Sequence, residues 1–359
     1  MKYCLLAAAL VLTTPQLQAA DADAKVEFRR AYAAYQQAVK NKDRNEARTQ
    51  AEIAYRTGRE VFGDAHANTA ALASNYGRLL NSEEAEKIFR EALPIYIKVY
   101  GEDAPELIDP LMDLAKVEVE YGRLTPAVKY YRRALDLAEE QDGEDSKLVG
   151  LLNLEVGQIA LQQAQSRKAI RYLEEAKEIF SRFDDQEAEI GLARANFWIG
   201  KYRIATNSYK NATEELLASL ATFEKYAPNA SMTMTNHAFL IHAYEKRGLR
   251  DEATKHCRAI GAAKPHDPTQ DYMPVFRTFP NYPRGAQVAG QEGYVVVALT
   301  VDEDGFVRNP HVVERDGASS FERAALEAVE QFRYVPRFED GKAVATEDVK
   351  YRFSFHLAD

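Results

Sequence analysis

The sequence contains little of what disulfide-bonded, metal-binding or nucleic-acid-binding proteins need. Its 359 residues include two cysteines, Cys4 and Cys257, and no zinc signature, glycine-rich phosphate loop or nucleophile elbow. Basic residues number 46 against 55 acidic ones, and the net charge of −9 argues against nucleic acid and against an anionic membrane surface as partners. No combination of acid, base and nucleophile stands out, which disfavours an enzyme. We therefore expect no cofactor, no metal ion and no small-molecule substrate.

A long apolar run is also missing at the start of the chain. The run at residues 4–12 has nine residues, whereas a helix that spans a bilayer needs about 20. Lys2 precedes this run, and residues 17–20 (Leu, Gln, Ala, Ala) supply the small residues of a cleavage site. We interpret residues 1–20 as a signal peptide that is removed on export. The mature chain then keeps one cysteine, Cys257, and cannot form an internal disulfide.

Residues 21–263 are predicted to be helical, with a pattern that repeats. The repeated alanines are Ala85, Ala127, Ala169, Ala212 and Ala253, spaced by 42, 42, 43 and 41 residues. Four positions after each alanine stands a larger residue: Phe89, Tyr131, Leu173, Leu216 and Cys257. Twelve positions before each alanine stand mostly small residues: Ala73, Ala115, Gly157, Gly200 and Ile241. This alternation predicts about six helical hairpins that stack into an all-α solenoid, because one hairpin cannot bury its apolar face alone.

His256 and Cys257 are adjacent, and such a pair could be catalytic or bind a metal. Cys257, however, occupies the column of large residues in the repeat. We therefore interpret the pair as structural.

The period of the apolar residues changes after residue 282. Val295, Val297, Leu299 and Val301 alternate with other residues, which predicts a strand with one buried face. The turn at residues 302–305 predicts a hairpin, and Ser319 with Glu322 predicts a capping box at the start of a helix. In the last predicted strand, residues 349–357, apolar residues alternate with polar ones. The order strand, strand, helix, strand indicates a small α+β domain at residues 282–359.

Four prolines occur in the stretch between the predicted helices and the α+β domain: Pro265, Pro268, Pro274 and Pro280. Helical periodicity is absent there. We interpret residues 264–281 as a linker.

Both predicted domains resemble known families. The helical pattern resembles tetratricopeptide (TPR) repeats of about 42 residues, although Glu118 and Arg203 replace the usual aromatic residue and predict looser packing there. The C-terminal residues resemble the C-terminal domain of the TonB energy transducers. The matching positions are Tyr282, Pro283, Ala286, Gly290, Gly293, Val295, Val297, Val301, Asp302, Gly305, Val307, Phe321, Ala324, Ala325, Leu326, Phe332, Tyr334, Pro336, Gly341 and the strand 349–357.

The resemblance implies a protein-binding module, since in that family this domain binds an extended segment of an outer-membrane receptor by adding it as a strand. The candidate binding residues in the C-terminal domain are Tyr282, Pro283, Arg284, Lys350, Arg352 and Ser354. In TPR solenoids the first helix of each hairpin usually lines the concave face. Exposed candidates there are Asn75, Tyr76, Asn153 and Asn196.

We therefore predict an exported periplasmic adaptor of the TonB family. Its expected partners are proteins: an outer-membrane TonB-dependent receptor, or periplasmic and inner-membrane transport components. The alternative is a membrane-anchored energy transducer that keeps residues 3–20 as an inner-membrane helix facing the periplasm. An envelope hydrolase or isomerase with an unrecognised site is a third, different class.

Overall fold

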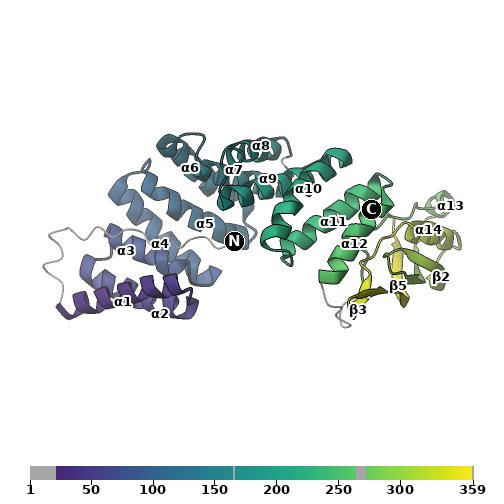
Figure 1. Ribbon diagram of the computed structural model, residues 1–359, viewed down its shortest axis with the longest axis horizontal. Coiled ribbons are helices and arrows are strands. Elements are labelled where there is room, and N and C mark those ends of the chain that lie inside the picture. The colour runs from purple at the N-terminus through teal and green to yellow at the C-terminus, as the bar shows by residue number, and fades with distance from the viewer. Residues whose placement is uncertain (1–21, 165, 264–271, 358–359) are drawn as a thin grey trace. The chain divides into compact units, whose positions relative to one another are not determined.

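The computed structural model describes residues 22–164, 166–263 and 272–357 (Figure 1). The chain divides into two compact units, Met1–Phe183 and Asp184–Asp359. The predicted signal peptide, residues 1–20, lies outside the described residues, and so does the first part of the predicted linker, residues 264–271. Within the described ranges, no helix combines the length and the hydropathy that a membrane span requires.

The first unit consists of helical hairpins (Figure 1). Its helices are α1 (Ala22–Asn41), α2 (Arg44–Phe62), α3 (Ala67–Gly77), α4 (Ser82–Tyr100), α5 (Ile108–Glu120), α6 (Leu124–Asp142), α7 (Lys147–Gln162) and α8 (Ser166–Phe180). Gly63, Gly101 and Gly143 follow α2, α4 and α6 with φ angles of 88°, 96° and 80°. Glycine adopts these positive φ angles without steric cost, so it ends these three hairpins and lets the chain turn into the next.

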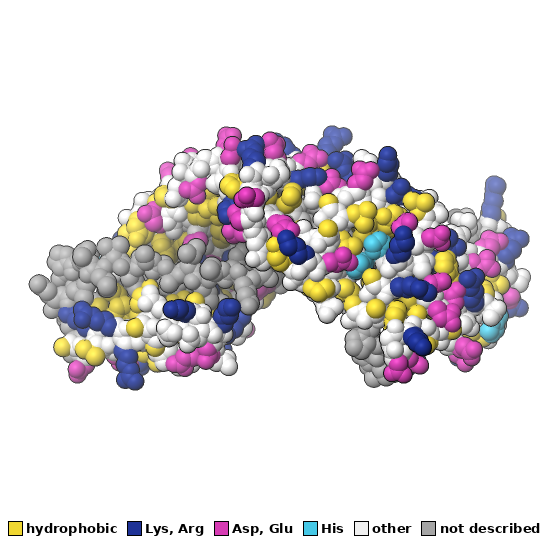
Figure 2. Space-filling model, in the orientation of Figure 1, with side chains coloured by type: hydrophobic (Ala, Val, Ile, Leu, Met, Phe, Trp, Pro, Cys, Tyr) yellow, Lys and Arg dark blue, Asp and Glu magenta, His cyan; other side chains and the backbone are white. Residues whose placement is uncertain are grey.

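The second unit continues the hairpins and then changes to the α+β domain. Its long helices are α9 (Gln186–Ala205), α10 (Tyr209–Tyr226), α11 (Ser231–Lys246) and α12 (Arg250–Ala263). The C-terminal domain contains α13 (Arg284–Val288), β1 (Gly293–Val301), β2 (Val307–Asp316), α14 (Ser320–Val329), β3 (Arg337–Glu339), β4 (Lys342–Val344) and β5 (Thr346–Phe355). Basic and acidic side chains are interspersed on the face of this unit that Figure 2 shows. The predicted fold class, a TPR-like solenoid followed by a small α+β domain, is confirmed.

The repeat columns are the core of the solenoid. All five repeated alanines are buried, and so are all five larger residues that follow them. Small residues face large ones across each hairpin: a Cβ added to Gly157 would lie 2.8 Å from Cγ of Leu173, and one added to Gly200 would lie 2.6 Å from Cγ of Leu216. Close helix approach therefore explains why glycine and alanine recur at these positions.

Glu118 does not loosen its repeat, contrary to the expectation from the sequence. Its side chain is buried, and its carboxylate accepts hydrogen bonds from Nη2 of Arg90, at 2.6 Å, and from Nε of Arg123. Arg90 and Arg123 also both pair with Glu86. An ion-pair network thus takes the space that an aromatic ring fills in the family pattern.

The sheet of the C-terminal domain has the strand order β2-β1-β5, and both pairings are antiparallel. Its buried face packs on α14, where the rings of Phe321 and Phe355 stack with centroids 4.2 Å apart. Two details differ from the prediction. The hairpin β3–β4 is additional, and α14 begins without a capping box because Ser319 has helical backbone angles and makes no capping hydrogen bond.

Residues 272–281 of the predicted linker pack against the C-terminal domain. The backbone N–H groups of Val275 and Phe276 donate to the carbonyl of Arg333, at 2.8 and 3.1 Å, and the Arg333 N–H donates to the Phe276 carbonyl at 2.9 Å. Phe276 is buried. This segment therefore belongs structurally to the domain that follows it.

Candidate protein-binding surfaces

The outer edge of β5 is a candidate site for an incoming strand. On one side β5 pairs with β1 in regular register, from Leu299 opposite Val349 to Gly293 opposite Phe355, and on the other side none of the described strands pairs with it. Asp348, just before this regular stretch, has a φ of 56° and lies beside a register shift. Along such an edge, every second residue directs its N–H and C=O away from the sheet. The site residues Lys350, Arg352 and Ser354 are exposed on this strand.

Arg352 interacts across the outer face of the sheet. Its guanidinium carbon lies 3.7 Å from the centroid of the Tyr294 ring on β1, and the Tyr294 hydroxyl donates to Oε1 of Glu314 on β2 at 2.6 Å. One row of side chains therefore connects all three strands. The cation–π contact orients the arginine along the face of the sheet.

Tyr282 anchors the start of the C-terminal domain near the end of β5. Its ring meets those of Phe321 and Phe355 edge to face, with centroids 5.5 and 5.8 Å apart, and its hydroxyl donates to the Gln291 carbonyl at 2.5 Å. Pro283 is the N-cap residue of α13, and Arg284 is exposed in its first turn. Tyr282 is thus mainly a packing residue, while Arg284 is available to a partner.

The asparagines predicted to be exposed on the first helices are buried, which corrects the sequence-based expectation. Relative exposure is 2% for Asn75, 1% for Asn153 and 6% for Asn196. Each lies on a helix (α3, α7 or α9) that packs against other helices. Both amide atoms of Asn75 and Asn153, and Oδ1 of Asn196, lack a hydrogen-bond partner among the described residues. Tyr76 is half-buried and stacks on Tyr55, with ring centroids 6.1 Å apart.

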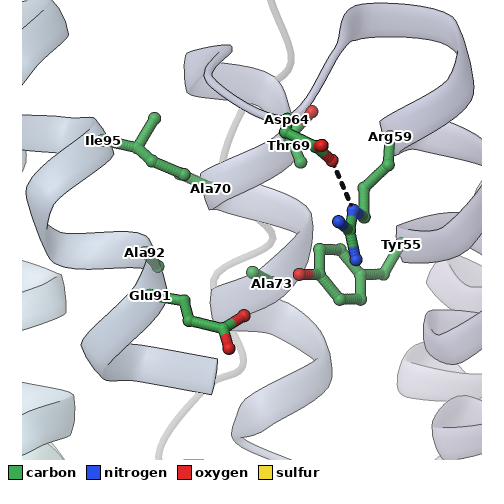
Figure 3. Close-up of a pocket in the computed structure, with 9 residues that line it drawn as sticks. All are labelled: Tyr55, Arg59, Asp64, Thr69, Ala70, Ala73, Glu91, Ala92 and Ile95. Carbon is green, nitrogen blue, oxygen red and sulfur yellow. Dashed lines mark hydrogen bonds and ion pairs between the residues drawn. The ribbon is translucent and has the colours of Figure 1, made fainter. Parts of the chain in front are cut away.

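A cavity of about 220 Å³ opens between α2, α3 and α4 (Figure 3). Its lining residues are Tyr55, Arg59, Asp64, Thr69, Ala70, Ala73, Glu91, Ala92 and Ile95. Three buried alanines contribute apolar surface, and the charged residues come from α2, from the turn after it and from α4. The sequence pattern could not reveal this cavity, because the same alanine columns also predict close packing.

A buried arginine joins the last repeat helices to the C-terminal domain. Arg333 is fully buried, and its Nη2 donates to Oγ1 of Thr254 at 2.8 Å and to the Asp304 carbonyl at 2.9 Å. Its Nη1 lies 3.1 Å from Oε1 of Glu245, close enough for an ion pair although not aligned as a hydrogen bond. The guanidinium carbon lies 3.7 Å from the centroid of the Phe306 ring.

Glu245, the ion-pair partner of Arg333, lies on α11. Burial raises the pKa of its carboxyl, whereas Arg333 and Arg250 act in the opposite direction. Outside the buried centre, Arg258 on α12 pairs with Asp304 at 2.8 Å, and the backbone of Gly261 approaches Pro336 and Phe338. The second unit therefore holds the repeat helices α11 and α12 and the C-terminal domain together through a polar, buried contact.

Two histidines meet on α11 and α12. Nδ1 of His237 lies 2.9 Å from Nδ1 of His256, and the Tyr244 ring stacks on that of His256. Burial lowers the pKa of both imidazoles, that of His256 to about 4, with the His237 charge acting in the same direction on His256. Within the described residues, no group of three His, Cys, Asp or Glu side chains is placed to hold a metal ion.

Two families account for the two kinds of structure. Residues 278–357 match the family described as Gram-negative bacterial TonB protein C-terminal, and residues 72–140 match the tetratricopeptide repeat. The chain therefore carries TPR repeats followed by a TonB C-terminal domain. Both are protein-interaction modules, and neither family is catalytic.

Individual relatives match only parts of the chain. Protein TonB of Pseudomonas aeruginosa (strain PAO1) is 36% identical over 83 residues, which are 23% of this chain and 24% of that protein. A clustered mitochondria protein homolog of Debaryomyces hansenii is 23% identical over 194 residues, 53% of this chain and 14% of that protein. The chain thus spans about a quarter or less of the length of these curated relatives.

Two solved structures are also similar to parts of the chain. BtubC (BKLC) from P. vanneervenii has a TM-score of 0.48 at 19% identity and covers 73% of this chain and 99% of its own. PilW, a type IV pilus biogenesis factor, has a TM-score of 0.47 at 15% identity and covers 68% of this chain and 94% of its own.

Proposed function

We propose that the protein is an exported adaptor of the cell envelope. The TPR repeats would hold one protein, while the TonB C-terminal domain binds an extended segment of another, in the first instance an outer-membrane receptor. The observation that carries the proposal is the outer edge of β5, which offers a regular row of backbone groups without a strand partner among the described residues.

Strand addition at this edge explains both affinity and selectivity. The backbone ladder would supply hydrogen bonds to any extended segment, whatever its sequence. Lys350 and Arg352 are the exposed charged residues of the regular stretch. Such charges discourage pairing with a second copy of the same edge, which carries the same charge, and favour a partner segment with acidic side chains.

A pair of proline variants tests strand addition. N–H groups of successive residues on a strand point to opposite edges. Of Tyr351→Pro and Arg352→Pro, one therefore removes a hydrogen bond to β1 and unfolds the sheet, and the other removes an N–H from the open edge. The variant that keeps the circular dichroism of the wild type should lose affinity for synthetic receptor segments.

Arg352→Ala is the control for the proline pair, because it leaves the backbone ladder intact. We expect it to retain most of the binding. A folded proline variant that binds as well as the wild type would exclude strand addition at this edge. Loss of binding in the alanine variant alone would instead assign recognition to the charge of Arg352.

We also propose that the adaptor works in the periplasm after removal of residues 1–20. The short apolar run and the small residues before Asp21 support this. N-terminal sequencing of the protein from fractionated cells tests it. An intact Met1 in the membrane fraction would favour the anchored transducer.

A further inference from the structure

We propose that the cavity between α2, α3 and α4 binds a primary alkylammonium group, supplied by a lysine side chain of a partner protein or by a free diamine. The cavity lies in the first unit, whereas the TonB domain lies in the second. Its charged lining comes from the second helices of two successive hairpins, α2 and α4, and from the turn after α2. The first helix α3 adds Thr69, Ala70 and Ala73 to the lining. The cavity is nevertheless independent of strand addition at β5, which lies in the second unit.

The charge balance of the lining favours a cation. Nε of Arg59 donates to Oδ1 of Asp64 at 2.6 Å, so these two charges offset each other. Glu91 interacts electrostatically with Arg59 but forms no ion pair or hydrogen bond with another described residue, and Figure 3 shows its carboxylate directed from α4 toward the Tyr55 hydroxyl on α2. Burial raises the pKa of Tyr55, the charge of Arg59 and a hydrogen bond from it act in the opposite direction, and the Glu91 charge adds to the effect of burial, so the phenol stays neutral. The charged side chains of the lining, Arg59, Asp64 and Glu91, therefore leave one negative charge in excess.

The size and surface of the cavity favour an unbranched chain that ends in the charge. Pockets for drug-sized ligands measure roughly 300–1,000 Å³, and this one, at about 220 Å³, suits a single long side chain. Ala70, Ala73 and Ala92 would contact the methylene groups of the stem. Glu91 and the Tyr55 hydroxyl are acceptors on facing helices. A compact ammonium with three rotatable donors can reach both, whereas a planar guanidinium prefers two parallel bonds to one carboxylate.

Methyl NMR of the full chain, labelled at the alanine methyl groups, tests the proposal with defined probes. The lysine probe is N-acetyl-lysine methylamide and the diamine probe is cadaverine; the controls are the uncharged norleucine analogue and the dianion glutarate. We expect saturable shifts of the Ala70, Ala73 and Ala92 signals at millimolar concentrations of at least one ammonium probe. The controls should leave these signals unchanged.

Variants of the charge and of the cavity complete the test. Glu91→Gln should weaken binding by about fivefold, the upper range for an exposed ion pair. Glu83→Gln, at a position that is also exposed on the same helix but lies outside the cavity, should leave binding unchanged. Ala73→Leu should abolish binding by filling the cavity.

The outcomes separate the two sources of the ammonium group. Binding of the lysine probe in preference to cadaverine identifies a protein side chain, and the reverse preference identifies a free diamine. Absence of shifts with both, equal shifts with glutarate, or an unchanged affinity in Glu91→Gln would overturn the proposal.

Discussion

Replacing Arg333 by methionine should strongly destabilise the contact between the repeat helices and the C-terminal domain. The change removes the ion pair with Glu245, the hydrogen bonds to Thr254 and to the Asp304 carbonyl, and the contact with the Phe306 ring. Glu245, which is 5% exposed at its side chain, then keeps, among the residues that the structure describes, the longer contact with Arg250 at 3.4 Å. Removing one partner of a buried ion pair costs about 3–5 kcal/mol, because the other charge is left buried.

Denaturant unfolding of the second unit would measure this cost. The single tryptophan of the chain, Trp198, lies on α9 of the same unit and reports its unfolding by fluorescence. Arg258→Met is the matched control, since Arg258 also pairs across the contact, with Asp304, but its side chain is 53% exposed. An exposed pair contributes at most about 1 kcal/mol.

Two results would show whether the reasoning holds. If Arg333→Met and Arg258→Met lower the free energy of unfolding equally, the buried arginine does not stabilise the contact and the argument fails. The double variant Arg333→Met, Glu245→Leu should recover part of the loss, because it leaves no lone charge in the buried contact.

Three further predictions concern the repeats. Leu173→Asp should lower the melting temperature severely, because it buries an unpaired charge. The control, Lys168→Asp at an exposed position, should lower it only slightly. Similar melting temperatures for the two variants would show that the repeat register is wrong. Gly157→Ala should cost about 1–2 kcal/mol in urea unfolding, because its Cβ would lie 2.8 Å from Leu173, and a stabilised variant would contradict this. The pKa of His256 is lowered from 6.5 to about 4 in the folded chain. Between these two pH values the unfolded chain therefore binds a proton at His256 that the folded chain does not bind. Stability should therefore fall by up to about 3 kcal/mol from pH 6.5 to 4, and His256→Phe should flatten this slope.

The sequence was sufficient for the repeats and the sheet because their signals are local and periodic. Ala127, Tyr131 and Ala134 follow one another at helical spacing, and all three are buried. The alternation from Val295 to Val301 likewise matches the buried face of β1. In both cases one face of an element packs against a neighbour, and residue type alone identifies that face.

Exposure of the asparagines could not be predicted in the same way. Asn75, Asn153 and Asn196 are polar, and polar residues are mostly exposed. In the structure their helices pack against other helices, so that even polar positions are covered. Which faces of a helix are covered depends on the neighbouring hairpins and not on the residue itself.

Arg333 escaped sequence analysis for a related reason. Arginine is almost never fully buried unless it is paired, and its partner Thr254 is 79 residues away in the chain. The hydrogen bond, the ion pair and the ring contact exist only once the C-terminal domain has packed against α11 and α12. No local pattern around residue 333 could signal them.

Cys257 lies next to Arg333, so its reactivity reports whether the contact between α12 and the C-terminal domain is closed or open. The Cys257 sulfur is 3.7 Å from Nη2 of Arg333, and burial raises the pKa of the thiol to about 11. At neutral pH the closed contact therefore presents a protonated, inaccessible sulfur that does not react with alkylating agents. Modification of Cys257 must wait until the domain moves away from α12. The rate of alkylation at Cys257, followed by mass spectrometry, would therefore measure how frequently the C-terminal domain separates from α12 in the native protein.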